Sequence, residues 1–573
     1  MLKTQFSLKN FRDQLASDEA LPQLVALGLV CGLACGLLIA AFRLAIDLPL
    51  AFALGTHVED FESLSLMERF LYPSVGGLIL AVIYTHFALI KNKVGLAHLF
   101  ERLTYHQGYI PAKNLIAQFI TATIALISGQ SVGREGPAIY MGASLASILG
   151  QYLHVPHNSQ RILVACGAAA AISAAFNTPL AGVIFAMEVI LLDYTIAGFT
   201  PIIVSAVCSS LVTRLIFSGD PVFDTISFDI VSHKEIPWIL LLGFIVGLLA
   251  SIFIKLMLFT KRSVTLPLSY RLMLAGLLTG IVAIFYPQVM GTGYDTISAT
   301  FTGQLSLSLL LGILIAKLIL TPVILGLGMP AGMIGPTLII GALAGAVLGL
   351  IGAYLTDLDV SDAGLYAMLG MGSMMAAVLN APLAALIALL ELTFNPHIIF
   401  AGMIAIVTAN LTTRHIFKMP PVFVALMQAQ GFDYRTEPLA QILTRISVAK
   451  VMTKKVQLCG EKISVASALT LIRSDTHWIV TQSKGLHTSI FPLFNLTHFV
   501  DRKIVVGQEL IDLQRMPAQR LDIVLLSQRS TVYDALMRMN SKNVDLLCIF
   551  DHKNFLIGIL TRSQIESYYN TKQ

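Results

Sequence analysis

The chain has 573 residues, of which 56% are hydrophobic and 12% are charged, and its formal net charge is +5. A soluble domain carries about 25% charged residues, so the composition excludes an ordinary soluble protein and indicates that most of the chain lies in lipid. No basic stripe suggests a nucleic-acid partner, and the six cysteines show neither zinc spacing nor a disulfide framework, so we expect no metal site.

The chain begins with a polar segment, 1–21, that carries Lys3, Lys9 and Arg12 and no small-residue cleavage site. We therefore expect an N-terminal segment there, not a removable signal peptide. Basic residues precede the first apolar run and follow the last one, which predicts that both termini are cytoplasmic.

Apolar runs long enough to span a bilayer recur from 22 to 430. A spanning helix needs roughly 20 apolar residues, and only helices or closed barrels can cross lipid. The runs are continuous rather than alternating, so we predict an all-α polytopic membrane domain whose number of crossings stays open. The runs cover about 22–46, 70–90, 114–132, 162–192, 198–217, 236–258, 270–286, 307–327, 332–355, 364–392 and 398–417.

Two segments of the membrane part occur twice and in the same order. GREGPAIYMGASLASILG (133–150) aligns with GMIGPTLIIGALAGAVLG (332–349) at 7 of 18 identical positions, and NTPLAGVIFAME (177–188) aligns with NAPLAALIALLE (380–391) at 6 of 12. The two segments are 44 residues apart in the first copy and 48 in the second. Such repeats point to a transport site between the two halves.

The pattern Gly-x-x-Gly-Pro in both copies predicts a helix that begins inside the membrane. Glycine frees the backbone, and proline suits the first helical turn because its missing N–H would be unpaired there anyway. The first N–H groups of such a helix are unpaired, and the helix dipole places about half a positive charge on them. Gly133, Gly136 and their repeat partners therefore predict an anion site that needs no formal cation.

Arg134 and Glu135 stand side by side at this helix start. We interpret Glu135 as a gate whose carboxylate occupies the anion site and leaves it on protonation, since ionisable residues at membrane depth are functional candidates. The alternative is an ordinary charge pair at a helix end.

These motifs resemble the CLC family of chloride channels and chloride/proton exchangers, over about 25–430. The resemblance implies an inverted-repeat helical domain, a homodimer with one pathway per subunit, and two or three anion positions in each. It implies that Glu135 is the external gating glutamate, and that the backbone amides of Met333 and Ile334 line the central anion position.

Two departures from the family pattern concern side-chain donors to the central anion. The family's Gly-Ser-Gly-Ile-Pro stretch matches Lys93–Leu99 best, where Gly95 fits but Val94 replaces the serine. The family's pore tyrosine matches Phe423, which lacks the hydroxyl and could equally be ordinary apolar packing. Backbone N–H groups would then have to hold the anion.

A third departure concerns protons. Exchangers of the family commonly have two adjacent glutamates after the second motif, and here Glu188 matches the first while Val189 replaces the second. Glu188 is a candidate proton relay, but we favour a structural carboxylate that caps a neighbouring helix, and its repeat partner Glu391 has the same reading. Lys317 is expected to be a snorkelling or paired structural charge.

Beyond a linker at 431–445, the soluble tail contains ISVAKVMTKKVQLC (446–459) and STVYDALMRMNSKNVDLLCIFDHKNFLIGILTRSQIESYY (530–569). These two stretches resemble the first and second modules of a cytoplasmic CBS pair, which implies an α/β fold for 446–573. Such pairs often bind adenine nucleotides through an acidic residue at the ribose. That position here is Gln564, so we expect a dimerising or tuning role and no cofactor.

The sequence therefore favours a CLC-type carrier of chloride or another small anion in the plasma or inner membrane. Exchange for protons is preferred because Glu135 is retained, and the alternative is a passive voltage- or pH-gated channel. A CBS-containing cation transporter would need clustered intramembrane carboxylates, which the apolar runs hardly offer. A membrane enzyme would need a metal, nucleophile or phosphate motif, and we find none.

Overall fold

The structure is a computed structural model that describes residues 15, 20–54, 60–87, 93–192, 196–217, 235–355, 363–432, 443–483, 486–501, 510–551 and 555–570. Its contacts divide the chain into two compact units. One holds Leu21–Leu153 with Gln160–Tyr434, and the other holds Arg435–Gln573 with Met1–Ala20 and His154–Ser159. The predicted segment 1–21 and the linker 431–445 fall largely outside the described residues.

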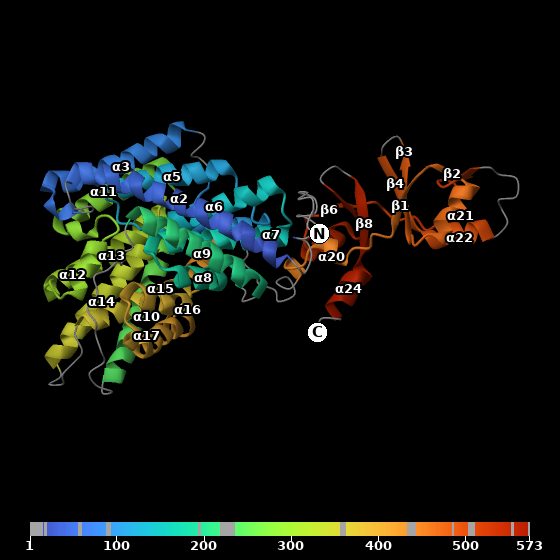
Figure 1. The fold of residues 1–573 in the computed structure, drawn as a ribbon. Coiled ribbons are helices and arrows are strands. Elements are labelled where there is room, and N and C mark those ends of the chain that lie inside the picture. Colours follow the sequence, from blue (N-terminus) through green and yellow to red (C-terminus); the bar gives the residue numbers. More distant parts are fainter. Residues whose placement is uncertain are drawn as a thin grey trace. The chain divides into compact units, whose positions relative to one another are not determined.

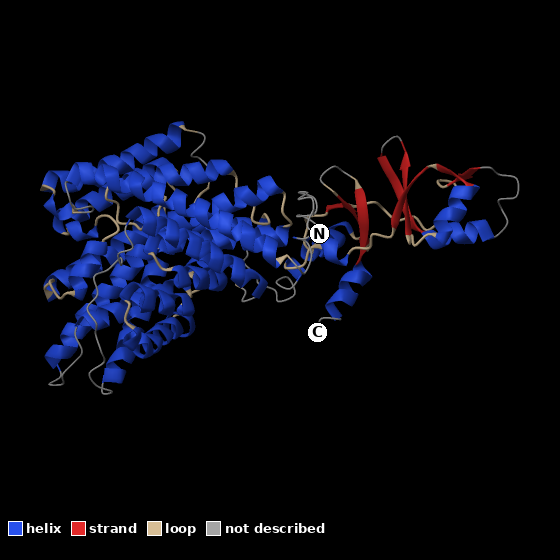
Figure 2. Cartoon of the chain, in the orientation of Figure 1, coloured by secondary structure: helices blue, strands red, loops and turns tan. Residues whose placement is uncertain are grey.

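The larger unit is a bundle of helices (Figures 1 and 2). Its first half contains α2 (Leu21–Leu54), α3 (Leu66–His86), α4 (Leu96–Tyr105), α5 (Ala112–Ile127), α6 (Glu135–Leu153), α7 (His157–Phe176), α8 (Pro179–Phe185) and α9 (Ile196–Phe217). Its second half contains α10 (Ile236–Ser263), α11 (Leu268–Phe285), α12 (Tyr294–Phe301), α13 (Leu307–Leu327), α14 (Ile334–Leu355), α15 (Ala363–Leu379), α16 (Pro382–Thr393), α17 (Ile399–Leu411) and α18 (Val422–Gln428).

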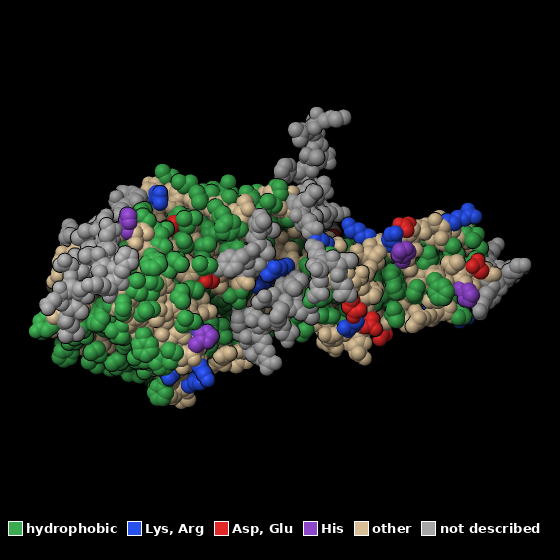
Figure 3. All heavy atoms as spheres, turned by 90° about the horizontal axis from the view of Figure 1, so that it is seen from below, with side chains coloured by type: hydrophobic (Ala, Val, Ile, Leu, Met, Phe, Trp, Pro, Cys, Tyr) green, Lys and Arg blue, Asp and Glu red, His purple; other side chains and the backbone are tan. Residues whose placement is uncertain are grey.

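Among the described residues, nine helices are long and apolar enough to cross a membrane. Hydrophobic side chains dominate the face of this unit that Figure 3 shows. This agrees with the predicted all-α polytopic domain, because lipid accepts an apolar exterior that water would not.

Two of the predicted apolar runs, 162–192 and 364–392, each divide into two helices. The break lies at Asn177 in the first run and at Asn380 in the second, with φ of 57° and 61°. Proline then opens the next helix in each copy, α8 and α16. A hydrogen bond from an arginine to the asparagine of the break also repeats. Arg214 Nε donates to Asn177 Oδ1 at 2.7 Å, and Arg414 Nε donates to Asn380 Oδ1 at 3.0 Å.

The repeat extends to the packing of its helices. A Cβ on Gly142 of α6 would overlap the carbonyl oxygen of Gly167 of α7, and a Cβ on Gly341 of α14 would overlap that of Gly370 of α15. Small residues let helix backbones approach closely, which drives association where lipid removes the hydrophobic effect. Both copies therefore use the same helix–helix contact, in which Gly142 and Gly341 hold equivalent places in the aligned segments 133–150 and 332–349.

The tail unit is built from α/β modules, as the sequence predicts. Its strands are β1 (Val456–Gly460), β2 (Lys462–Ser464), β3 (Trp478–Ser483), β4 (Leu486–Pro492), β5 (Leu510–Asp512), β6 (Leu525–Ser527), β7 (Leu546–Phe550) and β8 (Leu556–Thr561). Its helices are α20 (Val448–Val451), α21 (Val465–Arg473), α22 (Leu493–Asp501), α23 (Val532–Lys542) and α24 (Arg562–Asn570).

The two halves of the tail have matching sheets, β1-β3-β4 and β6-β7-β8. In each sheet the first pair of strands is parallel and the second antiparallel. Val480 and Ile490 of the first sheet share a buried core with Cys548 and Ile559 of the second. This duplication is compatible with the predicted module pair, whose assignment as CBS domains stays a prediction.

Candidate anion site

The two Gly-x-x-Gly-Pro motifs lie against each other at the centre of the helical unit. Gly133 N donates to Gly332 O and Gly332 N donates to Gly133 O, both at 2.8 Å, which forms a short antiparallel bridge. A Cβ on Gly136 would lie 2.7 Å from Gly332 Cα. Only glycine permits this approach, which brings the starts of α6 and α14 together inside the unit.

Glu135 is fully buried at this meeting point, with no exposed surface. Its Oε2 accepts a hydrogen bond from Gly335 N at 2.9 Å, so the carboxylate lies on the N-terminal turn of α14. A Cβ on Gly133 would overlap Oε2, and one on Gly335 would lie 3.0 Å from it. The carboxylate therefore occupies a space that the two glycines leave open and that helix N–H groups make favourable for negative charge.

Tyr294 is a contact that sequence reasoning missed. Its hydroxyl donates to Glu135 Oε1, so the carboxylate is held from two sides. Arg134 stacks its guanidinium over the Tyr294 ring, 4.9 Å from the centroid. One sequence signal was present: Tyr294 opens α12 directly after Gly-Thr-Gly (291–293), a glycine-rich helix start like those of the two motifs.

A cavity of about 530 Å³ borders the bridge between the motifs. Four of the predicted site residues line it, namely Val94, Gly95, Gly136 and Met333, together with the basic side chains of Lys93, Lys261 and Arg271. The Val94 side chain offers no hydrogen-bond donor. The positive side chains favour the presence of an anion in this cavity.

Phe423 and Ile334 are not among the residues that line this cavity. The Phe423 ring is 1% exposed and stacks on Phe100, with ring centroids 5.3 Å apart. The backbone N–H that reaches the Glu135 carboxylate belongs to Gly335, and the assignment of the Met333 and Ile334 amides to the central anion position stays a prediction. Phe423 thus packs against another ring, and its match to the family's pore tyrosine stays a prediction.

Glu188 caps a helix of the other repeat. Its carboxylate accepts hydrogen bonds from Leu383 N at 3.2 Å and Ala384 N at 2.8 Å, at the start of α16. Glu391 does the same for α8, accepting from Leu180 N at 3.0 Å and Ala181 N at 2.7 Å. Each repeat therefore supplies the carboxylate that caps a helix of the other repeat.

Lys317 is fully buried in α13, so it does not snorkel to an interface. A Cβ on Gly293 would lie 2.9 Å from its Nζ, which places the ammonium beside the start of α12. In the described part of the chain, no three His, Cys, Asp or Glu side chains lie close enough to hold a metal ion.

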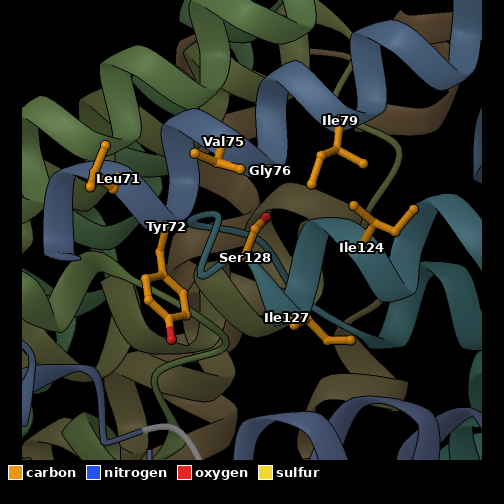
Figure 4. Close-up of a pocket in the computed structure, with 8 residues that line it drawn as sticks. All are labelled: Leu71, Tyr72, Val75, Gly76, Ile79, Ile124, Ile127 and Ser128. Atoms are coloured by element: carbon orange, nitrogen blue, oxygen red, sulfur yellow. The ribbon is translucent and has the colours of Figure 1, made fainter. Parts of the chain in front are cut away.

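A second hollow, of about 450 Å³, has a different character. It is lined by apolar side chains of α3 and α5, among them Leu71, Ile79 and Ile127 (Figure 4). Its two hydroxyl residues are Tyr72 and Ser128, and Ser128 Oγ already donates to Ala125 O at 3.0 Å. An apolar hollow cannot replace the hydration shell of an ion, so this hollow is not a candidate anion site.

Residues 76–414 match the family model described as voltage gated chloride channel. A putative chloride channel protein ClcB-like from Ralstonia nicotianae is 30% identical over 389 residues, which cover 66% of this chain and 89% of that protein. The voltage-gated ClC-type chloride channel ClcB of Escherichia coli O81 is 29% identical over 372 residues, covering 64% and 88% of the two chains.

Three solved structures share the fold. A slow cyanobacterial Cl⁻/H⁺ antiporter has a TM-score of 0.61 at 22% identity, covering 71% of this chain and 97% of its own. A CLC-type fluoride/proton antiporter has a TM-score of 0.60 at 21% identity, covering 70% and 97%. A eukaryotic CLC transporter has a TM-score of 0.60 at 18% identity and covers 94% of this chain and 97% of its own, so its similarity extends into the tail.

Proposed function

The chain belongs to the CLC family of voltage-gated chloride channels, and on that premise we propose that it carries chloride across a membrane in exchange for protons, with Glu135 as the gate. The observation that carries this proposal is the Glu135 carboxylate on the Gly335 N–H, at the start of α14. A carboxylate bound there stands in for a transported anion. It blocks the pathway while it is charged and loses its attraction to the helix N-terminus on protonation.

Helix N-termini suit transport better than a cationic side chain would. Partial charges bind an anion well enough for entry and weakly enough for release. Lys93, Lys261 and Arg271 raise the local concentration of anions in the adjacent cavity, and the backbone N–H groups then receive the ion.

The alternative function is passive conduction of chloride. It is favoured by Val189, which replaces the second glutamate of the exchanger pattern. Glu188 also has both carboxylate oxygens bound to backbone N–H groups, as a cap would have. Exchange would then need a proton route that does not pass through Glu188.

Reconstitution of the whole chain in liposomes tests the proposal. Under a chloride gradient, an exchanger drives protons uphill, and their movement is read by a pH-sensitive dye inside the vesicles. A channel instead brings chloride to its Nernst potential and moves no protons. Absence of any chloride flux would contradict the proposal and its alternative together.

The substitution Glu135→Gln tests the gate within the same assay. Because glutamine has no titratable proton, we expect chloride flux to lose its pH dependence. Glu235→Gln is the matched control: Glu235 is also buried and accepts a hydrogen bond from a tyrosine, Tyr366 at 2.7 Å, but lies outside the site. An unchanged pH profile in Glu135→Gln would remove Glu135 from the gate.

The proposal includes a homodimer with one pathway in each subunit, an inverted relation between the repeats, and cytoplasmic termini in a plasma or inner membrane. No cofactor is needed for transport. The tail is proposed to tune transport without a nucleotide. This is supported by Gln564, which lies in the first turn of α24. Its Oε1 accepts the Thr561 N–H at 2.9 Å, so the side chain caps that helix. Equilibrium dialysis of the full chain against ATP would reveal binding and contradict this part.

A further inference from the structure

Among the described hydrogen bonds, the one from the Tyr294 phenol is the one in which a side chain donates to the Glu135 carboxylate. It donates to Oε1 while Gly335 N donates to Oε2. The two donors come from different helices, α12 and α14, and converge on one negatively charged group. Any small anion that replaced the carboxylate would meet the same two donors.

The position of this phenol is set by packing that does not involve Glu135. Gly293, the N-cap of α12, has φ of 73°, in the left-handed region that favours glycine. A Cβ there would lie 2.7 Å from Ile339 Cδ1 of α14. The Tyr294 ring also lies 6.3 Å from the Phe176 ring, centroid to centroid. The hydroxyl therefore stays in place when the carboxylate leaves.

Two positions that the family resemblance assigns to side-chain donors carry none in this chain. Val94 offers no side-chain donor there, and Phe423 is stacked on Phe100 and has no hydroxyl. Hydrogen bonds to a charged group contribute more than those to a neutral one. A hydroxyl placed elsewhere along the pathway therefore adds a neutral side-chain donor to the backbone and basic groups that the anion meets.

We propose that Tyr294 is an anion ligand of the outer position: its hydroxyl donates to Glu135 when the gate is closed and to the transported anion when the gate has left. This inference rests on the proposed function and adds a binding residue to it. The position pairs a phenol O–H with the Gly335 N–H, which suits a halide or another small monovalent anion.

Several charged groups surround the outer position. Arg134 lies over the Tyr294 ring, and Arg43 of α2 interacts electrostatically with Arg134, Tyr294 and Asp47. Asp295 of α12 interacts with Lys317 of α13. Since Tyr294→Phe alters none of these charges, its effect reports the hydroxyl alone.

The test measures chloride binding to the purified full chain by titration calorimetry, together with the pH profile of flux in liposomes. Tyr294→Phe should weaken chloride binding about tenfold, the low end for loss of a hydrogen bond to a charged group. It should also move the half-maximal flux to higher pH, because the charged form of the gate loses a hydrogen-bond donor.

The Glu135→Gln background separates the two roles of the hydroxyl. In that background Tyr294→Phe should still weaken chloride binding about tenfold, while the pH profile, already flat, should not change. Tyr366→Phe is the matched control, because its hydroxyl donates to the buried Glu235 outside the site, and it should leave both quantities unchanged. A 3-fluorotyrosine at position 294 is a stronger donor of nearly the same shape and should tighten binding, which no folding defect would do.

Three outcomes would overturn the inference. Unchanged chloride binding in Tyr294→Phe would do so, provided that the unmodified chain binds chloride. Loss of the effect in the Glu135→Gln background would show that Tyr294 binds only the Glu135 carboxylate and not the transported anion. An equal effect of Tyr366→Phe would assign the change to the fold. Failure of the unmodified chain to bind or move chloride would contradict the proposed function instead.

Discussion

Carboxylates lie at two kinds of helix start in this protein. Glu188 and Glu391 each accept two backbone N–H groups, at the starts of α16 and α8. Glu135 accepts one backbone N–H and one phenol at the start of α14. Two hydrogen bonds from consecutive N–H groups make a helix cap, whereas Glu135 has the mixed pair of donors that the proposed exchange with a free anion would use.

The reciprocal caps give a prediction with an internal control. If Glu188 is only a cap, Glu188→Gln and Glu391→Gln should destabilise the protein to a similar extent, by about 1–3 kcal/mol each, because each loses charge at equivalent hydrogen bonds. Thermal unfolding in detergent measures this. Neither substitution should change the ratio of protons to chloride in liposomes.

A proton relay at Glu188 predicts a different pattern. Glu188→Gln alone would then lower proton flux while Glu391→Gln left it intact, and the two variants would still unfold alike. Such a difference in proton flux between the two variants would show that Glu188 belongs to the proton pathway.

The sequence predicted the Glu135 carboxylate but not all of the residues that hydrogen-bond to it. Glu135 is recognisable because its motif is local, a glycine-flanked carboxylate at a helix start. Tyr294 lies 159 residues away from Glu135, and only the pairing of the two motifs brings α12 to the site. For the same reason the sequence did not predict that the carboxylate reaches Gly335 N, because the Gly133–Gly332 bridge decides which N–H lies beside it.

Among the helices, close glycine contacts hold the two repeats in the same way. The contact of Gly341 with Gly370 reproduces that of Gly142 with Gly167. We expect Gly370→Ala to destabilise the protein by about 1–3 kcal/mol, the usual cost of overpacking, because the added methyl group overlaps the Gly341 carbonyl oxygen.

Gly372 provides the control on the same helix, α15. A Cβ there would lie 3.5 Å from its nearest neighbour, an ordinary contact. Gly372→Ala should therefore be neutral or slightly stabilising, since alanine is the better helix former by about 1 kcal/mol. Thermal unfolding of the two variants side by side measures the difference, and equal melting temperatures would show that the helices can move apart without cost.

The helices themselves were predictable from length and hydropathy, but their internal breaks were not. The runs 162–192 and 364–392 stay apolar across Asn177 and Asn380, so the hydropathy hardly changes where each helix ends. The break depends on a left-handed asparagine followed two residues later by proline. Those are local backbone effects, which a window of 20 residues averages away.

For the whole molecule, the apolar exterior of the helical unit is explained by lipid and needs no protein partner. On α16 and α17, Leu383, Phe400 and Val407 each leave half or more of the side chain exposed, as do residues on several other helices. The proposal of a homodimer is therefore supported by the family resemblance and not by any one apolar surface. It has to be tested on the assembled protein.

Mixed dimers provide that test. Two affinity tags allow purification of an assembly with one unmodified subunit and one Glu135→Gln subunit, and a monomeric protein would yield nothing after the second column. If each subunit has its own pathway, chloride flux at one dimer per vesicle should be the sum of two contributions. The unmodified subunit should contribute a pH-dependent flux, and the Glu135→Gln subunit a flux that does not depend on pH. A single shared pathway would instead give one profile that is not this sum, because both gates would act on the same anion.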